Sequence, residues 1–267
     1  MSAMDMFWTA PPVTRTITAA AAVTSVLVYT GILNAGYIVF IPYKIFKLWL
    51  PELWRLPTSF LLTSPKLGML LDPYFLFTYG KALEVGSARF TNPADFLVFI
   101  VFVCSVISIL AGLWLSSFVF LQPLILALAY LYAQENPEQQ MTFYIVTFRV
   151  KFLPYCMLLM TLVMDSPTSA MNQATGLVAA HLYDFLTRIW PAFGRGSNPI
   201  KTPQVLQRWF DSAPGAPRTT THGTAFQARP SAGQAQPAAR ASTGGWTSGF
   251  SGNSWGGRGP GHRLGGD

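Results

Sequence analysis

Residues 96–115 form an almost purely aliphatic and aromatic run that is long enough to cross a bilayer as a single helix. Ser116 and Ser117 then give a very short connection to a second apolar run, residues 118–133. Two spans joined so closely must be antiparallel neighbours. Because the chain is 51% hydrophobic and only 11% charged, it cannot present an ordinary solvated surface. The pattern predicts a polytopic membrane protein.

Four further apolar runs raise the expected number of transmembrane helices to six. They cover residues 17–41, 67–83, 141–164 and 169–190, and the second of them is short and interrupted by polar residues. Between the first two runs, residues 43–66 mix aromatic and aliphatic side chains with lysine and arginine, which suits a segment in the plane of the membrane surface. We therefore expect an all-α polytopic membrane protein with a six-helix membrane domain over residues 17–191.

The formal net charge of +7 lies entirely in the C-terminal part of the chain. Residues 1–186 contain nine Lys and Arg and nine Asp and Glu, whereas residues 187–267 contain nine and two. Past residue 191 the composition shifts to Gly, Pro, Ser, Ala, Thr and Gln, with too few large apolar side chains for a core. We expect residues 192–267 to be a disordered basic tail. The positive-inside rule and an even number of spans place this tail and residues 1–16 in the cytosol.

The two cysteines, Cys104 and Cys156, both lie inside apolar runs. Their placement supports neither a disulfide framework nor a zinc site, and small buried side chains are the better interpretation. The sequence predicts no metal site and no cofactor.

Several short strings, in one collinear order over residues 8–191, resemble a known family. They are Pro11-Pro-Val-Thr-Arg15, Leu53-Trp-Arg-Leu56, Tyr79-Gly-Lys-Ala-Leu-Glu-Val-Gly-Ser-Ala-Arg89 with Ala94-Asp95-Phe96, Asn136-Pro137, and Gly176-Leu-Val-Ala-Ala-His-Leu-Tyr183 with Trp190-Pro191. Together they resemble the Derlins, rhomboid-like proteins of the endoplasmic reticulum membrane, in a fungal-type form. The resemblance implies a six-helix rhomboid-like bundle, cytosolic termini, and a part in moving misfolded proteins out of the endoplasmic reticulum for degradation.

The same resemblance implies partners. A Derlin binds misfolded protein substrates, works with a membrane-bound ubiquitin ligase complex, and can assemble with itself or with other Derlins in the lipid bilayer. Its tail recruits a hexameric AAA ATPase through a glycine-rich peptide, the SHP box, which residues 255–265 resemble. The residues that carry this likeness are Trp255, Gly259, Gly261, Arg263, Leu264 and Gly265. His262 stands where the family often has phenylalanine, and no nucleic-acid partner is expected, although an Arg/Gly segment alone would also suit nucleic acid.

Catalysis by a rhomboid protease needs a serine at the start of the fourth helix and a histidine on the sixth. In the family pattern the histidine stands three residues before the first glycine of the packing motif. Counting back from Gly176 gives Gln173, whose amide cannot act as a general base. Residues 118–124, where the nucleophile belongs, contain no serine. The resemblance therefore implies a pseudoprotease.

One catalytic alternative remains open at this point. His181 on the sixth run and Ser116 or Ser117 in the preceding turn are the residues from which a different dyad could be built. We favour the simpler interpretation, in which the histidine packs or hydrogen-bonds and the serines are turn residues.

Polar side chains within the apolar runs are expensive in a bilayer, where a charge at the centre of a span costs about 2.5 to 3.5 kcal/mol. Such groups need partners or water, which a polar cleft would supply. The candidates are Gln122, Arg149, Asn172, Gln173 and His181. Snorkelling toward the interface is an equally good interpretation of Arg149 and of Lys151. A cleft and a locally thinned bilayer, favoured by the short run 67–83, would lower the barrier to a crossing polypeptide.

Two short motifs have structural interpretations. Trp54 and Arg55 are ordinary interfacial anchors by residue type, and the resemblance implies that they fix the first loop in the membrane surface. Gly176 and Ala180 form a small-xxx-small packing motif on the sixth run, with alanine where the family usually has glycine.

Two other functions compete with a non-catalytic part in degradation. One is an active intramembrane serine protease of the rhomboid type, which the residues above argue against. The other is a rhomboid-like trafficking receptor that has no path for a crossing polypeptide.

Overall fold

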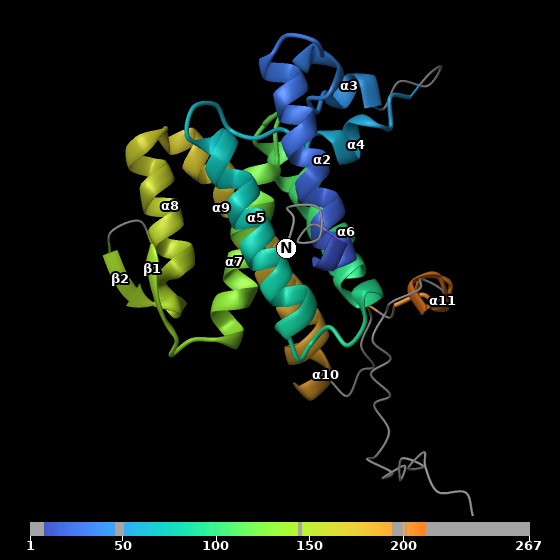
Figure 1. Cartoon of the computed structure of the whole chain (residues 1–267), viewed down its shortest axis with the longest axis vertical. Coiled ribbons are helices and arrows are strands. Elements are labelled where there is room, and N and C mark those ends of the chain that lie inside the picture. The colour runs from blue at the N-terminus through green and yellow to red at the C-terminus, as the bar shows by residue number, and fades with distance from the viewer. Residues whose placement is uncertain (1–7, 46–50, 144–145, 194–199, 201, 212–267) are drawn as a thin grey trace, which may run out of the picture. The chain divides into compact units, whose positions relative to one another are not determined.

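The computed structural model describes residues 8–45, 51–143, 146–193, 200 and 202–211 (Figure 1). The α-helices are α2 (Pro12–Tyr29), α3 (Pro42–Ile45), α4 (Arg55–Thr58), α5 (Gly68–Gly86), α6 (Pro93–Ile107), α7 (Leu121–Glu135), α8 (Leu153–Met164), α9 (Pro167–Asp184), α10 (Trp190–Phe193) and α11 (Gln204–Asp211). Two strands, β1 (Gln140–Phe143) and β2 (Val146–Arg149), form an antiparallel hairpin between α7 and α8. The described part is thus mostly helical, as the sequence predicts.

Helix α7 is the centre of the bundle. Most of its side chains are buried, because α5, α8 and α9 pack around it and α6 also touches it (Figure 1). The buried alanines Ala127, Ala129 and Ala133 are small enough for neighbouring helices to come close. At Gly176 of α9 the approach is closest, since an added Cβ would lie 1.8 Å from the carbonyl oxygen of Pro123. Small residues therefore set the α7–α9 contact.

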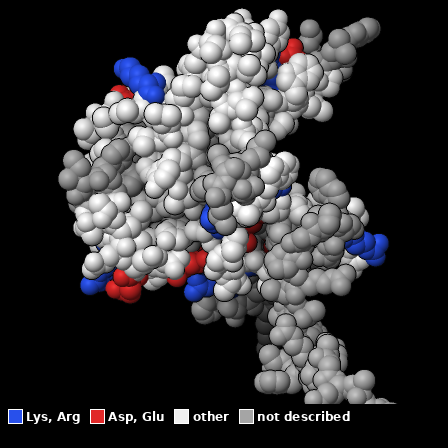
Figure 2. All heavy atoms as spheres, in the orientation of Figure 1, with Lys and Arg blue, Asp and Glu red and all other residues white. Residues whose placement is uncertain are grey.

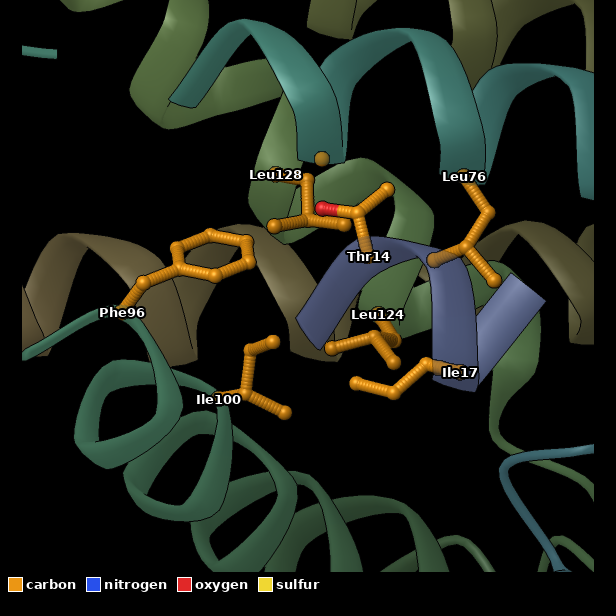
Figure 3. A pocket seen from close by; sticks show the side chains of 8 residues that line it. Thr14, Ile17, Leu76, Phe96, Ile100, Leu124 and Leu128 are labelled. Carbon is orange, nitrogen blue, oxygen red and sulfur yellow. The ribbon is translucent and has the colours of Figure 1, made fainter. Parts of the chain in front are cut away.

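Helix α2 is tied to α5 at its start. Three donors at the first turn of α2, the backbone N–H groups of Val13 and Thr14 and the Thr14 hydroxyl, bond to the carboxylate of Glu84 at 3.0, 2.7 and 2.7 Å. These N–H groups have no partner within the helix, so Glu84 caps it from a distance of 70 residues in sequence. Figure 3 shows the apolar junction beside this cap, where side chains of α2, α5, α6 and α7 meet. They include Ile17, Leu76, Phe96, Ile100, Leu124 and Leu128.

A polar cluster joins the ends of α7 and α9 that lie near the start of α6. The Arg89 guanidinium bonds to Glu135 at 3.1 Å and to Asp184 at 2.6 Å. Ser87 donates from its hydroxyl to the same Glu135 carboxylate at 2.5 Å. Both Ser87 and Arg89 belong to one of the strings that resemble the Derlins, and in the structure they hold three helices together.

Residues 93–114 form the one helical stretch, among the described residues, that is both long and apolar enough to cross a bilayer. It is α6 continued by a π-helical segment, Ser108–Trp114, and it matches the predicted run 96–115. Figure 2 shows one face of the molecule that is mostly uncharged, with Lys, Arg, Asp and Glu gathered largely toward its lower part and at its upper edge. That the other five runs cross a bilayer stays a prediction.

The first predicted span, residues 17–41, is wrong at both ends. Helix α2 begins at Pro12, whose missing N–H costs nothing in the first turn, and it ends at Tyr29. Gly31 follows with a φ of +79°, the left-handed conformation that closes many helices. The chain then makes a short 3₁₀ turn, Ala35–Tyr37, before α3.

The fifth predicted span is wrong over its first half. Gln140–Phe143 and Val146–Arg149 form the hairpin, in which Met141 pairs with Phe148 and Thr142 pairs with Thr147. Met141 and Phe148 lie on the face that packs against the core, and the threonines lie on the exposed face. This period-two alternation is the signature of a half-buried strand, so the helix starts only at Leu153.

Part of the segment predicted to be a disordered tail is folded. Trp190–Phe193 continue the sixth helix, and Gln204–Asp211 form α11. The Thr202 hydroxyl donates to Asp95 of α6 at 2.5 Å, and Ile200 and Phe210 pack against the core. Residues 200 and 202–211 are therefore part of the folded body, whereas 212–267 lie outside the described residues.

Candidate functional site

A cleft of about 330 Å³ opens between the start of α5 and the end of α8, with α7 and α9 as its inner wall. Met157, Met160 and Met164 form its α8 side. Methionine side chains are flexible and polarisable, so this wall can adapt to different apolar surfaces. The cleft combines an apolar lining with a few polar side chains, which makes it the candidate binding site.

Two of the predicted polar side chains, Gln122 of α7 and Gln173 of α9, line this cleft. Gln173 is buried, with 4% of its surface exposed, and its Oε1 has no hydrogen-bond partner among the described residues. Leaving a buried amide oxygen unsatisfied costs about 1–3 kcal/mol. Such a cost is recovered when water or a bound molecule donates to it.

Asp72 is a third polar side chain of the cleft, and the sequence interpretation missed it. The Asp72-Pro73 pair reads as an interruption of the second apolar run. In the structure α5 continues through Pro73, and the Asp72 carboxylate accepts a hydrogen bond from the backbone N–H of Ser64 at 2.7 Å. That bond ties the loop before α5 to the helix. An acidic residue beside proline within an apolar run was the signal that could have identified it.

Asn172 and His181 lie on α9 at different levels. The side-chain amide of Asn172 donates to the carbonyl of Val119 at 3.1 Å. Asn172 therefore lies beside the loop that follows Ser116 and Ser117. Nine helical residues later, about 13 Å further along the axis, His181 Nδ1 bonds to the Tyr130 hydroxyl at 2.9 Å. His181 is therefore separated from Ser116 and Ser117 along the axis of α9. The alternative dyad has no geometric support, and His181 does not line the cleft.

A model of the Der1-like family matches residues 10–204, which is most of the chain. The chain belongs to the Der1-like family. Derlin-1 of Homo sapiens is 30% identical to this Der1-like protein over 220 residues, covering 79% of this chain and 84% of the relative. Derlin-1 of Arabidopsis thaliana is 31% identical over 215 residues, covering 77% and 78%. Derlin-1.1 of Zea mays is 31% identical over 212 residues, covering 78% and 84%.

The resemblance to Derlins is therefore confirmed, and this Der1-like protein belongs to a family of membrane proteins. These relatives come from an animal and from plants, so the fungal-type form stays a prediction.

In the first loop of this Der1-like protein, Arg55 is fully buried while Trp54 is 54% exposed. The Arg55 guanidinium donates to the carbonyl oxygens of Gly36 and Val39 at 2.6 and 3.0 Å and forms an ion pair with Glu52. One side chain thus fastens α4 to the segment between α2 and α3. Trp54 presents its ring at the surface, as an interfacial anchor would.

The two residues of the small-xxx-small motif on α9 make different contacts. Gly176 lies against the Pro123 carbonyl of α7, and Ala180, one turn further on, is fully buried in the core. Both positions face the interior of this Der1-like protein.

Arg149 lies outside the cleft. It ends strand β2, its side chain is 54% exposed, and it pairs with Glu138 at 3.3 Å. Lys151 is also exposed, with its ammonium 5.2 Å from the centre of the Phe152 ring. The cleft-lining interpretation of Arg149 is corrected because the hairpin moves both residues out of the helix.

Two predictions concern residues that cannot be placed. The tail residues 255–265 lie outside the described residues, as does the start of the predicted cytosolic segment 1–16. Within the described residues no group of three His, Cys, Asp or Glu side chains is arranged to hold a metal ion.

Proposed function

We propose that this Der1-like protein is a non-catalytic component of endoplasmic-reticulum-associated degradation. The cleft between α5 and α8 takes up segments of misfolded proteins and helps them pass to the cytosol. The observation that carries the proposal is the cleft itself, in which Gln122 and the unsatisfied Gln173 line a cavity that lies between helices of a membrane-family bundle. Such a site binds a chain without cutting it.

The residues that line the cleft support a binding role. The cleft lining includes Ser64 and Thr161 but no histidine. Gln173 occupies the place that the histidine takes in the rhomboid pattern, and an amide cannot accept the proton of a serine hydroxyl at neutral pH. Bound polypeptide would therefore leave the cleft intact.

The short helix α8 supports local thinning of the bilayer. It has 12 residues and extends about 18 Å, less than the roughly 30 Å of a typical hydrocarbon core. Lipids next to a short apolar helix compress to match it. A thinner bilayer beside a polar cleft shortens the apolar distance that a polypeptide must cross.

We extend the proposal to the setting in which the protein works. We place the protein in the endoplasmic reticulum membrane with both termini cytosolic, near a membrane-bound ubiquitin ligase complex and other Derlin copies. The tail at 255–265 recruits the AAA ATPase that supplies the pulling force. Arg55 and the exposed ring of Trp54 hold the first loop at the membrane surface.

The proposal is tested by making the inner wall of the cleft apolar. We expect the pair of changes Gln122→Leu and Gln173→Leu to slow degradation of a misfolded membrane substrate in a chase experiment. Both leucines fit an apolar bundle, so the variant should still fold. A matched pair on the hairpin, Gln140→Leu with Thr142→Val, leaves the cleft untouched and should leave degradation at the wild-type rate. Unchanged degradation in the cleft variant would contradict the proposal.

A further inference from the structure

Asp72 is a buried carboxylate that lacks a cationic partner. Only 7% of the residue is exposed, and its carboxylate accepts a hydrogen bond from the backbone N–H of Ser64. Among the described residues no Lys, Arg or His lies within ion-pair distance of it. Because ionised carboxylates are costly to bury without a partner, acidic residues in membrane segments generally pair with a cation.

We infer that the cleft is a receptor site for membrane-spanning segments that carry a basic side chain, with Asp72 as the counter-charge. This inference rests on the proposed function, because it names the class of segment that the same cleft selects. It goes beyond that function in assigning the selection to Asp72.

The side-chain amides of Gln122 and Gln173 give the site further hydrogen-bond acceptors. A lysine ammonium has three N–H donors and an arginine guanidinium has five. Asp72 accepts hydrogen bonds from some of these donors. The unpaired Oε1 of Gln173 is a further acceptor in the same cleft. Gln122 supplies a second amide oxygen. The site therefore has the acceptors that a desolvated cation requires.

The rest of the lining suits the apolar remainder of such a segment. The three α8 methionines, with Leu71, Phe75 and Ile125, form an apolar wall. Two charged residues at exposed positions, Lys66 and Asp165, oppose each other in sign, so Asp72 sets the net negative charge of the cleft. An acidic segment is repelled by that charge, and a basic one is attracted.

A basic residue in a membrane span also has a reason to leave the lipid. Burying its charge at the centre of a span is costly unless the charge is paired. A segment that has lost its acidic partner, as in an unassembled subunit, retains this cost. When the basic side chain pairs with Asp72, the cost of burying each of the two charges is removed, because each gains a partner.

The test uses the full-length protein in phosphatidylcholine vesicles with model single-span peptides of about 20 apolar residues. One peptide set carries a single Lys at one of three depths, a second carries Glu there, and a third carries Leu. A photoreactive residue replaces Met160 in the cleft wall, and crosslinking is titrated with peptide. We expect half-maximal crosslinking of the best Lys peptide at a concentration about tenfold below that of the Leu peptide.

The key variant is Asp72→Asn, which keeps an oxygen acceptor for Ser64 and removes only the charge. It should reduce the preference for Lys to about twofold or less, whereas the matched change Glu138→Gln, in the turn before β1, should retain it. Thermal unfolding of both variants checks that they fold. If Asp72→Asn unfolds, the test is the ratio of Lys-peptide to Glu-peptide crosslinking in the wild-type protein. Only a charged site distinguishes those two peptides.

Two results would overturn the inference, and they are distinguishable. Equal crosslinking of Lys and Leu peptides at Met160, or a Lys preference unchanged in Asp72→Asn, removes the role of Asp72 and leaves the proposed function standing. No crosslinking of any peptide at Met160 removes both.

Discussion

Gly176 of α9 lies directly against the backbone of Pro123 of α7. A Cβ built on the glycine would fall 1.8 Å from the Pro123 carbonyl oxygen, closer than two such atoms can approach. The neighbouring atom is backbone, which cannot rotate away as the end of a side chain can. The closest helix pair of the bundle therefore depends on the absence of one methyl group.

We predict that Gly176→Ala destabilises the folded bundle by about 1–3 kcal/mol or more, the range typical of overpacked cores. Helices α7 and α9 would have to move apart, which also displaces Gln122 and Gln173 in the cleft. Thermal unfolding in detergent measures the effect. Gly86→Ala is the matched control, because nothing lies within 4 Å of a Cβ there. Equal melting temperatures for the two variants would refute the close approach.

A second prediction concerns Arg55. Arg55→Ala removes the donors to the carbonyls of Gly36 and Val39 and leaves Glu52 unpaired. Each unsatisfied buried group costs about 1–3 kcal/mol, so we expect the first loop to loosen and substrate degradation to slow while the protein still inserts in the membrane. Protease sensitivity of residues 34–60 in membrane vesicles reports the loosening.

Two control variants help to interpret the Arg55→Ala result. Arg55→Lys keeps the charge but lacks the planar fork that reaches two carbonyls, so it should give an intermediate result. Trp54→Ala, at an exposed neighbour, should change stability in detergent by less than about 0.5 kcal/mol. If Arg55→Ala leaves both protease sensitivity and degradation at the wild-type level, the loop does not depend on this guanidinium.

The third prediction is that Thr202 holds α11 against α6. The isolated α11 has only eight residues, too few for a stable helix by itself. Thr202→Val preserves the shape of the side chain and removes its hydrogen bond to Asp95. We expect faster amide hydrogen exchange in Gln204–Asp211, with exchange in α6 unchanged. Thr202→Ser retains the hydroxyl and should restore slow exchange; equal rates in the valine and wild-type proteins would mean that the bond is dispensable.

The sequence was most informative where apolar residues were continuous. The run 96–115 predicted α6 and its π-helical continuation, which together cover residues 93–114, because a long run without charged side chains has few alternatives. The run 141–164 was misleading because a short amphipathic hairpin precedes an apolar helix, and Arg149 and Lys151, which separate the two, were interpreted as residues within one span. Here the alternation of Met141, Thr142, Thr147 and Phe148 was the decisive pattern.

Long-range contacts account for what sequence patterns missed in the site. Gln122 and Gln173 were predicted as cleft residues from polarity alone, and the structure brings them together with Asp72. Arg149 satisfied the same criterion, yet it lies on a hairpin and pairs with Glu138. The importance of Glu84 and Arg89 was equally hidden, since their partners are 70 and 95 residues away in the chain.

The fourth prediction concerns the C-terminal tail, where Arg263 and Leu264 stand in a glycine-rich frame. A peptide that folds on binding depends on few anchors, so the loss of one apolar anchor removes much of its affinity. We expect Leu264→Ala, or truncation after Phe250, to abolish co-purification of the AAA ATPase. Ser251→Ala, in the same stretch but outside residues 255–265, should retain it. Wild-type recovery of the ATPase with the truncated protein would show that recruitment uses another surface.

The central claim, that the cleft between α5 and α8 receives misfolded polypeptide, is tested most directly by photo-crosslinking in membranes. A photoreactive residue is placed at Met160 in the cleft or at Val101, which is 57% exposed on α6 outside the cleft lining. During degradation of a misfolded membrane protein, we predict a full-length substrate adduct at Met160 that is at least several-fold stronger than at Val101. Equal adducts at the two positions, or an adduct to Val101 alone, would contradict the account.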